Sequence, residues 1–205
     1  PGELIDGLIE QGARELTVVN NNAGNGDTGL AALLKAGRVR KVICSFPRQV
    51  DSQVFDALYR SGQLELELVP QGNLAERIRA AGAGIGAFFS PTGYGTLLAD
   101  GKETREIDGR HYVLETALKA DVSLVKAWKA DKAGNLVFRK TARNFNPAVA
   151  MAGKVCVAEV EELVEIGAID PDHVHLPGIY VDRIVVNATP EQRIEQRTIR
   201  QPEEN

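Results

Sequence analysis

The chain has 205 residues, of which 43% are hydrophobic and 25% are charged. This composition excludes a disordered protein. The formal net charge of −4 comes from interleaved acidic and basic residues, which excludes the basic surface that nucleic acid or an anionic membrane would require. No apolar run reaches the ~20 residues of a membrane span, and no signal peptide is visible, so we expect a soluble, cytoplasmic protein.

The first 80 residues alternate between helical and strand patterns. Apolar residues at helical spacing predict helices over 3–11, 30–36 and 54–61. Asn73 followed by Glu76 is typical of a capping box at the start of a fourth helix, through Arg79. Strand patterns over 16–19, 39–45 and 64–69 lie between these helices. In the last of them, leucines alternate with glutamates, which predicts an apolar face made of Leu64, Leu66 and Leu68.

The second half has a different texture. Asp108-Gly109 is a strong hairpin signal, and a second hairpin is expected to turn at 133–135. Further strands are expected over 154–160 and 179–186. No linker and no internal repeat is visible. We therefore expect residues 1–205 to form one α/β domain, a mostly parallel sheet flanked by helices and extended by the later antiparallel strands and hairpins.

A glycine pattern follows the first predicted strand. Gly24, Gly26 and Gly29 spell G-x-G-x-x-G between a strand and a helix, as in dinucleotide-binding loops. Such loops turn tightly off the strand, whereas here Asn20, Asn21, Asn22 and Ala23 intervene. The acidic ribose ligand expected about 20 residues later has only Asp51 as a candidate. The alternatives are a simple turn, or asparagine amides that face a substrate oxygen as it gains negative charge.

Polar side chains follow three consecutive predicted strands at the same edge of the sheet. They are Asn21 and Asn22 after the first strand, Arg48 after the second and Gln71 after the third. Ligands of α/β proteins bind at the carboxyl ends of parallel strands. Gln71 could donate to a carboxylate or thioester oxygen, or could simply belong to a turn. This convergence predicts a ligand-binding site more strongly than any one of the four residues does.

A second glycine cluster spans 80–96. Five glycines remove side chains over a predicted surface loop, and three aromatic residues add flat faces: Gly82, Gly84, Gly86, Gly93, Gly95, Phe88, Phe89 and Tyr94. Such a loop could let a ligand lie against the backbone, or it could be a long structural loop.

Other reactive side chains favour structural roles. Cys44 and Cys156 lie far apart in apolar surroundings and are expected to be buried, reduced thiols. His173 and His175 have no further metal ligands at recognisable spacing and are expected in a solvated loop, and His111 is expected to be structural. Three lysines near Trp128 are expected on a solvated strand face: Lys126, Lys129 and Lys132. Trp128 itself could serve a contact between subunits. No nucleophile motif is evident.

Several longer stretches resemble a known family. VVNNNAG (18–24), SFPRQ (45–49), the block 69–96, LVKAWKADKAGNLVFRKTARNFN (124–146) and VEELVEIGAID (160–170) are similar to the alpha subunit of the class I 3-oxoacid CoA-transferases. The similarity runs over essentially the whole chain. SFPRQ and the short segment 99–107 resemble most the members that act on 3-oxoadipate. The family also has a strand and a glycine loop near its N-terminus, and we expect residues 1–205 to form one CoA-transferase domain of the alpha type without them.

The resemblance implies a function and a partner. It implies ping-pong transfer of coenzyme A from succinyl-CoA to 3-oxoadipate, in the β-ketoadipate pathway of aromatic-compound degradation. It places the nucleophilic glutamate in the beta subunit, so no catalytic nucleophile is expected in this chain. It implies a heterodimer or heterotetramer with that beta subunit, no permanently bound cofactor or metal, and coenzyme A thioesters as substrates. Asn21 and Asn22 match the family's paired active-site asparagines, and Gln71 matches its active-site glutamine.

Arg48 carries a hypothesis about the acceptor. The 3-oxoadipate molecule has a distal carboxylate that acetoacetate lacks, and Arg48 could pair with it bidentately. A surface or interface arginine is the alternative. An acetoacetate-using alpha subunit and a non-catalytic ligand-binding domain stay open as other functions.

Overall fold

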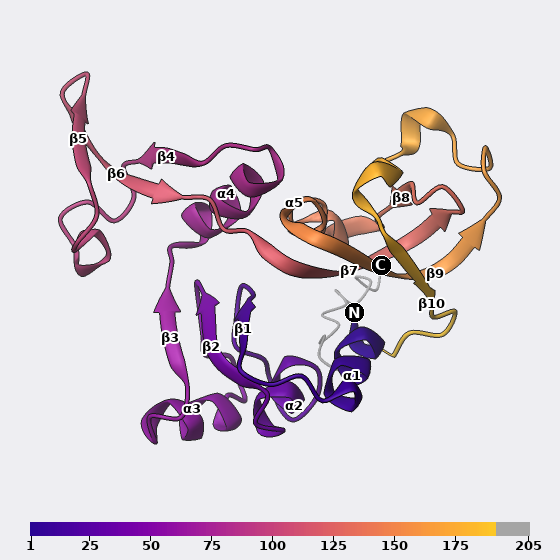
Figure 1. The fold of residues 1–205 in the computed structure, drawn as a ribbon, viewed down its shortest axis with the longest axis horizontal. Coiled ribbons are helices and arrows are strands. Elements are labelled where there is room, and N and C mark those ends of the chain that lie inside the picture. Colours follow the sequence, from indigo (N-terminus) through magenta and orange to yellow (C-terminus); the bar gives the residue numbers. More distant parts are fainter. Residues whose placement is uncertain (192–205) are drawn as a thin grey trace, which may run out of the picture.

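The computed structural model describes residues 1–191 (Figure 1). Its first part is a three-stranded parallel sheet in the order β1 (Leu16–Val19), β2 (Val39–Cys44) and β3 (Glu65–Leu68). The connecting helices are α1 (Gly2–Gln11), α2 (Leu30–Lys35), α3 (Gln53–Arg60) and α4 (Gln71–Gly82). The predicted order of elements is confirmed over these residues.

Helices cover both faces of this sheet. Side chains of α1, α2 and α3 pack with Val42 and Cys44 in one core, whereas Ile43 and Val69 pack with α4 and α5 (Asn146–Ala152) in another. Consecutive buried residues in β2 are what a strand covered on both faces requires. The predicted apolar face of β3 is only partly correct, because Leu64 is buried and Leu68 is 45% exposed.

The later strands form two further sheets. The strands β4 (Ala87–Ser90), β5 (Thr104–Ile107) and β6 (Arg110–Thr116) make an antiparallel sheet whose β5–β6 hairpin projects from the body in Figure 1. The predicted turn is confirmed, since Asp108 and Gly109 both have positive φ, 50° and 73°. The expectation that later strands extend the first sheet is wrong, because their hydrogen-bonding edges pair with one another instead.

The third sheet has the order β10-β9-β7-β8, and its two long strands pair in parallel. These are β7 (Ala120–Asp131) and β9 (Gly153–Val164), with β8 (Leu136–Val137) after the expected turn and β10 (Arg183–Val186) shorter than predicted. Short 3₁₀ helices complete the fold at Leu97–Ala99, Lys140–Arg143, Pro171–His173 and Gly178–Tyr180. No helix in residues 1–191 is long and apolar enough to cross a membrane.

Candidate functional site

The carboxyl ends of β1, β2 and β3 point toward α4, α5 and the third sheet (Figure 1). Backbone hydrogen bonds join the loops that follow β1 and β2. Phe46 N–H donates to the Asn21 carbonyl over 3.0 Å, and Ala23 N–H donates to the Pro47 carbonyl over 3.4 Å. Parallel pairing places both loops at the same edge, as the sequence predicted. The two loops that carry the polar side chains are therefore fixed to each other by backbone hydrogen bonds donated from both loops.

Asn21 is the centre of a hydrogen-bonded group. Its Oδ1 accepts from Ser45 Oγ over 2.6 Å and from Gln71 Nε2 over 2.9 Å. Ser45 follows β2 and Gln71 begins α4, so the three residues come from the ends of three neighbouring strands. Two donors fix the carboxamide with its oxygen turned inward. Within residues 1–191, no acceptor engages Asn21 Nδ2, which leaves that amide group able to donate to a substrate oxygen.

Asn22 plays a different part in the same loop. Its Oδ1 accepts from Gly24 N–H over 2.9 Å, and its backbone carbonyl accepts from Asn20 Nδ2 over 3.0 Å. These are local turn contacts that fix the asparagine run. Asn20, Asn22 and Asn25 also line a cavity of about 250 Å³ together with residues of α1 and α2. The asparagines therefore shape the edge of a cavity as well as a turn.

All three glycines of the G-x-G-x-x-G pattern have positive φ, and packing also requires the first of them, Gly24. A Cβ on Gly24, where φ is +90°, would lie 2.5 Å from Ala31 N at the first turn of α2. Only glycine permits both this φ and this approach. The helix that follows has six residues. The loop continues to Gly26, whose N–H donates to the Asp51 carbonyl over 2.8 Å. Asp51 thus supports this loop through its backbone.

Arg48 lies outside the Asn21 group. Its Nε donates to Asp56 Oδ1 of α3 over 2.8 Å, and its side chain is 57% exposed. The sequence predicted its place after β2 correctly. The structure adds an acidic partner that local patterns could not reveal.

The second glycine cluster is more structured than predicted. It contains the end of α4 and the strand β4, so it is wrong to describe it as one surface loop. A Cβ on Gly82 would lie 2.4 Å from Met151 Cβ, which shows that this glycine lets α4 approach α5. Gly84 follows the C-cap residue of α4, with φ +73° and open space around it.

The predicted capping box is wrong. Pro70, not Asn73, precedes the helix, and Asn73 is a buried residue in its first turn. Asn73 bonds to Ser90 and to Glu115, two residues more than fifteen positions away in sequence. The sequence spacing alone could not distinguish the two roles, because asparagine serves both as a helix cap and in tertiary hydrogen bonds. Ser45 was also missed as a site residue, although its place at the end of the second strand was a usable signal.

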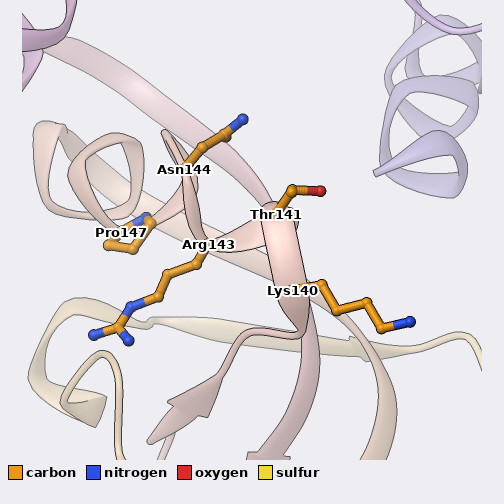
Figure 2. A pocket seen from close by; sticks show the side chains of 5 residues that line it. All are labelled: Lys140, Thr141, Arg143, Asn144 and Pro147. Carbon is orange, nitrogen blue, oxygen red and sulfur yellow. The ribbon is translucent and has the colours of Figure 1, made fainter.

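A shallow surface hollow beside α5 does not gather functional groups. Lys140, Thr141, Arg143, Asn144 and Pro147 line a shallow hollow of about 640 Å³. Figure 2 shows Lys140 and Arg143 extending in different directions, with Asn144 directed away from both. No group of charges converges there, so the carboxyl edge of the parallel sheet is the better candidate.

The cysteines and the two C-terminal histidines lie outside the Asn21 group. Burial raises the pKa of Cys44 to about 11 and also raises that of Cys156, and both are free thiols, as predicted. His175 Nδ1 accepts from Phe138 N–H over 2.9 Å, and burial, with nearby Arg143, lowers its pKa. His173 is exposed beside Asp170. No group of three or more metal-ligating side chains occurs in the described part of the chain.

The face around Trp128 is less solvated than predicted. Lys126 Nζ lies buried, 3.7 Å from Glu159 and 3.6 Å from Glu161. Lys129 lies over the Trp128 ring at 4.5 Å. Opposite charges from the neighbouring strand β9 make this arrangement possible, which the lysine spacing alone could not show.

Comparison with known proteins identifies the class. Residues 1–187 match the Coenzyme A transferase family. The chain belongs to this family and corresponds to its alpha subunit. It is 69% identical to the alpha subunit of the 3-oxoadipate CoA-transferase of Pseudomonas putida over 185 residues, which cover 90% of this chain and 80% of that protein. It is 65% identical over 201 residues to the alpha subunit of the succinyl-CoA:3-ketoacid coenzyme A transferase of Xanthomonas campestris pv. campestris (strain B100), covering 98% and 82%.

Solved structures share the fold. An acyl-CoA transferase from Escherichia coli O157:H7 superposes with a TM-score of 0.81 at 22% identity, covering 97% of this chain and 44% of that chain. Glutaconate coenzyme A-transferase from Acidaminococcus fermentans gives a TM-score of 0.81 at 21% identity, covering 91% and 66%. These findings confirm the predicted α/β class and the family resemblance. Membership in this family makes coenzyme A thioesters the substrate class of the chain.

Proposed function

We propose that this chain is the alpha subunit of a transferase that moves coenzyme A from succinyl-CoA to 3-oxoadipate, and that it works with a beta subunit. The Asn21 amide, whose Nδ2 has no acceptor within residues 1–191 and whose Oδ1 is held by Ser45 and Gln71, carries the proposal. The 69% identity to the Pseudomonas putida protein supports 3-oxoadipate as the acceptor. The similarly high identity to the Xanthomonas campestris protein supports acetoacetate or another 3-oxoacid as the second candidate.

The proposed chemistry has two matched halves. A glutamate carboxylate of the beta subunit attacks the thioester carbonyl of succinyl-CoA, forming a mixed anhydride and releasing the CoA thiolate. The thiolate then attacks the glutamyl carbonyl of the anhydride, which gives a glutamyl-CoA thioester and free succinate. The acceptor carboxylate attacks this thioester, again forming an anhydride and the thiolate. The thiolate attacks the acyl carbonyl, which yields the new acyl-CoA and restores the glutamate carboxylate.

Each attack places negative charge on a carbonyl oxygen, and a donor held in place lowers the cost of that charge. In the proposal, Asn21 Nδ2 donates to this oxygen, and Gln71 and Ser45 keep the Asn21 amide turned toward it. Asn22 lines the adjoining cavity and acts in substrate binding. Gly84 leaves open space for a ligand at the end of α4. Gly82 is also proposed to contact the ligand, in addition to its packing against α5.

Arg48 is proposed to select the acceptor. Because its Nε donates to Asp56, a bidentate pair with the distal carboxylate of 3-oxoadipate would use its two Nη atoms. Acetoacetate offers no such carboxylate. The substrate preference of an Arg48 variant therefore separates this role from that of a surface arginine.

A thioester-exchange assay tests the proposal. The chain, alone and co-expressed with its beta subunit, is mixed with succinyl-CoA and with either 3-oxoadipate or acetoacetate, and acyl-CoA products are followed by absorbance. We expect exchange only with the partner and a higher kcat/KM for 3-oxoadipate. Preference for acetoacetate would replace the acceptor, and no exchange by the complex would favour a ligand-binding domain without catalysis.

A further inference from the structure

A buried polar cluster lies between the first turn of α4 and the antiparallel sheet. Asn73 of α4 is 3% exposed, Ser90 at the end of β4 is 9% exposed and Glu115 of β6 is 3% exposed. Burying such groups is costly unless each finds a partner. Asn73 bonds to both of the other residues, so the cluster joins three elements that are distant in sequence.

The hydrogen bonds of Asn73 use both ends of its carboxamide. Its Oδ1 accepts from Ser90 Oγ over 2.7 Å, and its Nδ2 donates to Glu115 Oε1 over 3.2 Å and to the Thr92 carbonyl over 3.4 Å. Ser90 Oγ in turn accepts from Thr92 N–H over 3.3 Å. The helix turn, the end of β4 and the loop after it are thereby joined at one point.

Charges extend the cluster toward the parallel sheet. Glu115 Oε1 accepts from Lys102 Nζ over 2.8 Å, and Glu115 Oε2 lies 3.9 Å from Arg77 Nε. Arg77 also pairs with Glu67 of β3 over 3.1 Å and donates to the Thr116 carbonyl over 2.8 Å. Arg77 and Asn73 both come from α4, so this one helix is fixed to both sheets by buried and partly buried polar contacts.

The cluster and the candidate site share one helical turn. Gln71 and Asn73 are two residues apart, which on an α-helix is a rotation of about 200°. Their side chains therefore leave opposite sides of the turn, Gln71 toward Asn21 and Asn73 toward the antiparallel sheet. No capping side chain holds the start of α4. The contacts of Asn73 replace a cap as the restraint on this turn.

We infer that the Asn73–Ser90–Glu115 cluster positions Gln71, and through it the Asn21 amide, for the transfer reaction. These three are positioning residues, since in the described part of the chain none of them bonds to a residue at the carboxyl edge of the parallel sheet. The inference rests on the proposed role of Asn21 and Gln71. The antiparallel sheet, whose β5–β6 hairpin lies far from that edge in Figure 1, thus affects the geometry of the site through the buried Asn73.

A double-mutant cycle on the complex with the beta subunit tests the inference. Ser90→Ala removes the hydroxyl that donates to Asn73, and Gln71→Ala removes the side chain that is positioned. We expect Ser90→Ala alone to lower kcat about 10-fold with KM for succinyl-CoA within about 2-fold, since small misplacements of reacting groups are costly. In the Gln71→Ala background, Ser90→Ala should lower kcat no further. Ser61→Ala is the matched control, because Ser61 is an exposed serine that bonds to the Leu58 carbonyl on α3.

The outcomes separate the possible causes. An equal fall in kcat in both backgrounds would mean that Ser90 acts on stability or assembly, and the inference would be overturned. Unchanged kcat in Ser90→Ala, with a clear loss in Gln71→Ala, would overturn it and leave the proposed function standing. Unchanged kcat in Gln71→Ala would contradict the proposed function as well. Ser90→Cys, nearly the same size with a weaker donor, should give an intermediate kcat and serves if the alanine variant folds poorly.

Discussion

Asn21→Asp is the substitution that most directly tests the proposed oxyanion donor. Aspartate has the shape of asparagine, and its carboxylate can still accept from Ser45 Oγ and Gln71 Nε2. The folded structure should therefore tolerate the change. The Nδ2 donor, however, becomes an oxygen that carries negative charge, at the point where the reacting carbonyl gains charge of the same sign.

The expected loss follows from two effects. Removing one donor from an oxyanion site costs about 10²–10³-fold in kcat. Two like charges about 4 Å apart repel by about 4 kcal/mol at an effective dielectric constant of 20, or roughly 10³-fold. Because Asn21 is partly exposed, solvent weakens this repulsion, so we expect a fall in kcat of at least about 10³-fold in all.

The assay is thioester exchange by the complex with the beta subunit, together with thermal unfolding of each variant. Asn144→Asp is the control, since Asn144 is exposed, accepts locally from Phe145 N–H and lies in the shallow hollow of Figure 2. Its kcat should match that of the unmodified complex. If Asn21→Asp keeps a kcat within about 10-fold of the parent with an unchanged Tm, Asn21 does not act as the oxyanion donor.

Three further outcomes are expected. Arg48→Met should raise KM for 3-oxoadipate far more than KM for acetoacetate, whereas Asp56→Ala should not raise KM for 3-oxoadipate selectively. Equal losses on both acceptors in Arg48→Met would show that Arg48 does not bind the acceptor. Gly82→Ala should lower the free energy of unfolding by about 1–3 kcal/mol, because the new methyl group would collide with α5. Gly72→Ala on the same helix has open space and should raise the free energy of unfolding by up to about 1 kcal/mol. Urea unfolding measures both changes, and similar effects of the two substitutions would contradict the packing role of Gly82. Burial lowers the pKa of His175 in the folded chain, so the unfolded chain binds the proton more readily and stability should fall as the pH drops below about 6.5. In His175→Asn, the dependence of stability on pH in this range should be weaker. An unchanged dependence would assign it to other groups.

The sequence by itself determined the local elements and the edge where the site lies. Apolar spacing and turn residues act over a few positions, so the order of the first seven elements and the Asp108-Gly109 hairpin could be predicted. The carboxyl ends of parallel strands meet at one edge, which is why Asn21 and Gln71 could be placed together before any distance was known. The family resemblance depended on residues over the whole chain and was confirmed.

The tertiary structure decided which partner each polar residue takes. Ser45 orients Asn21, Asp56 pairs with Arg48, and Asn73 bonds to Glu115 instead of capping its helix. It also decided that the later strands form separate sheets. The three hydrogen bonds join residues separated by 8 to 42 positions, and a local pattern contains no information about which distant group will be brought within about 3 Å. Only the packing of the strands and helices against one another selects those partners, and a buried group such as Asn73 must be satisfied wherever the fold places it.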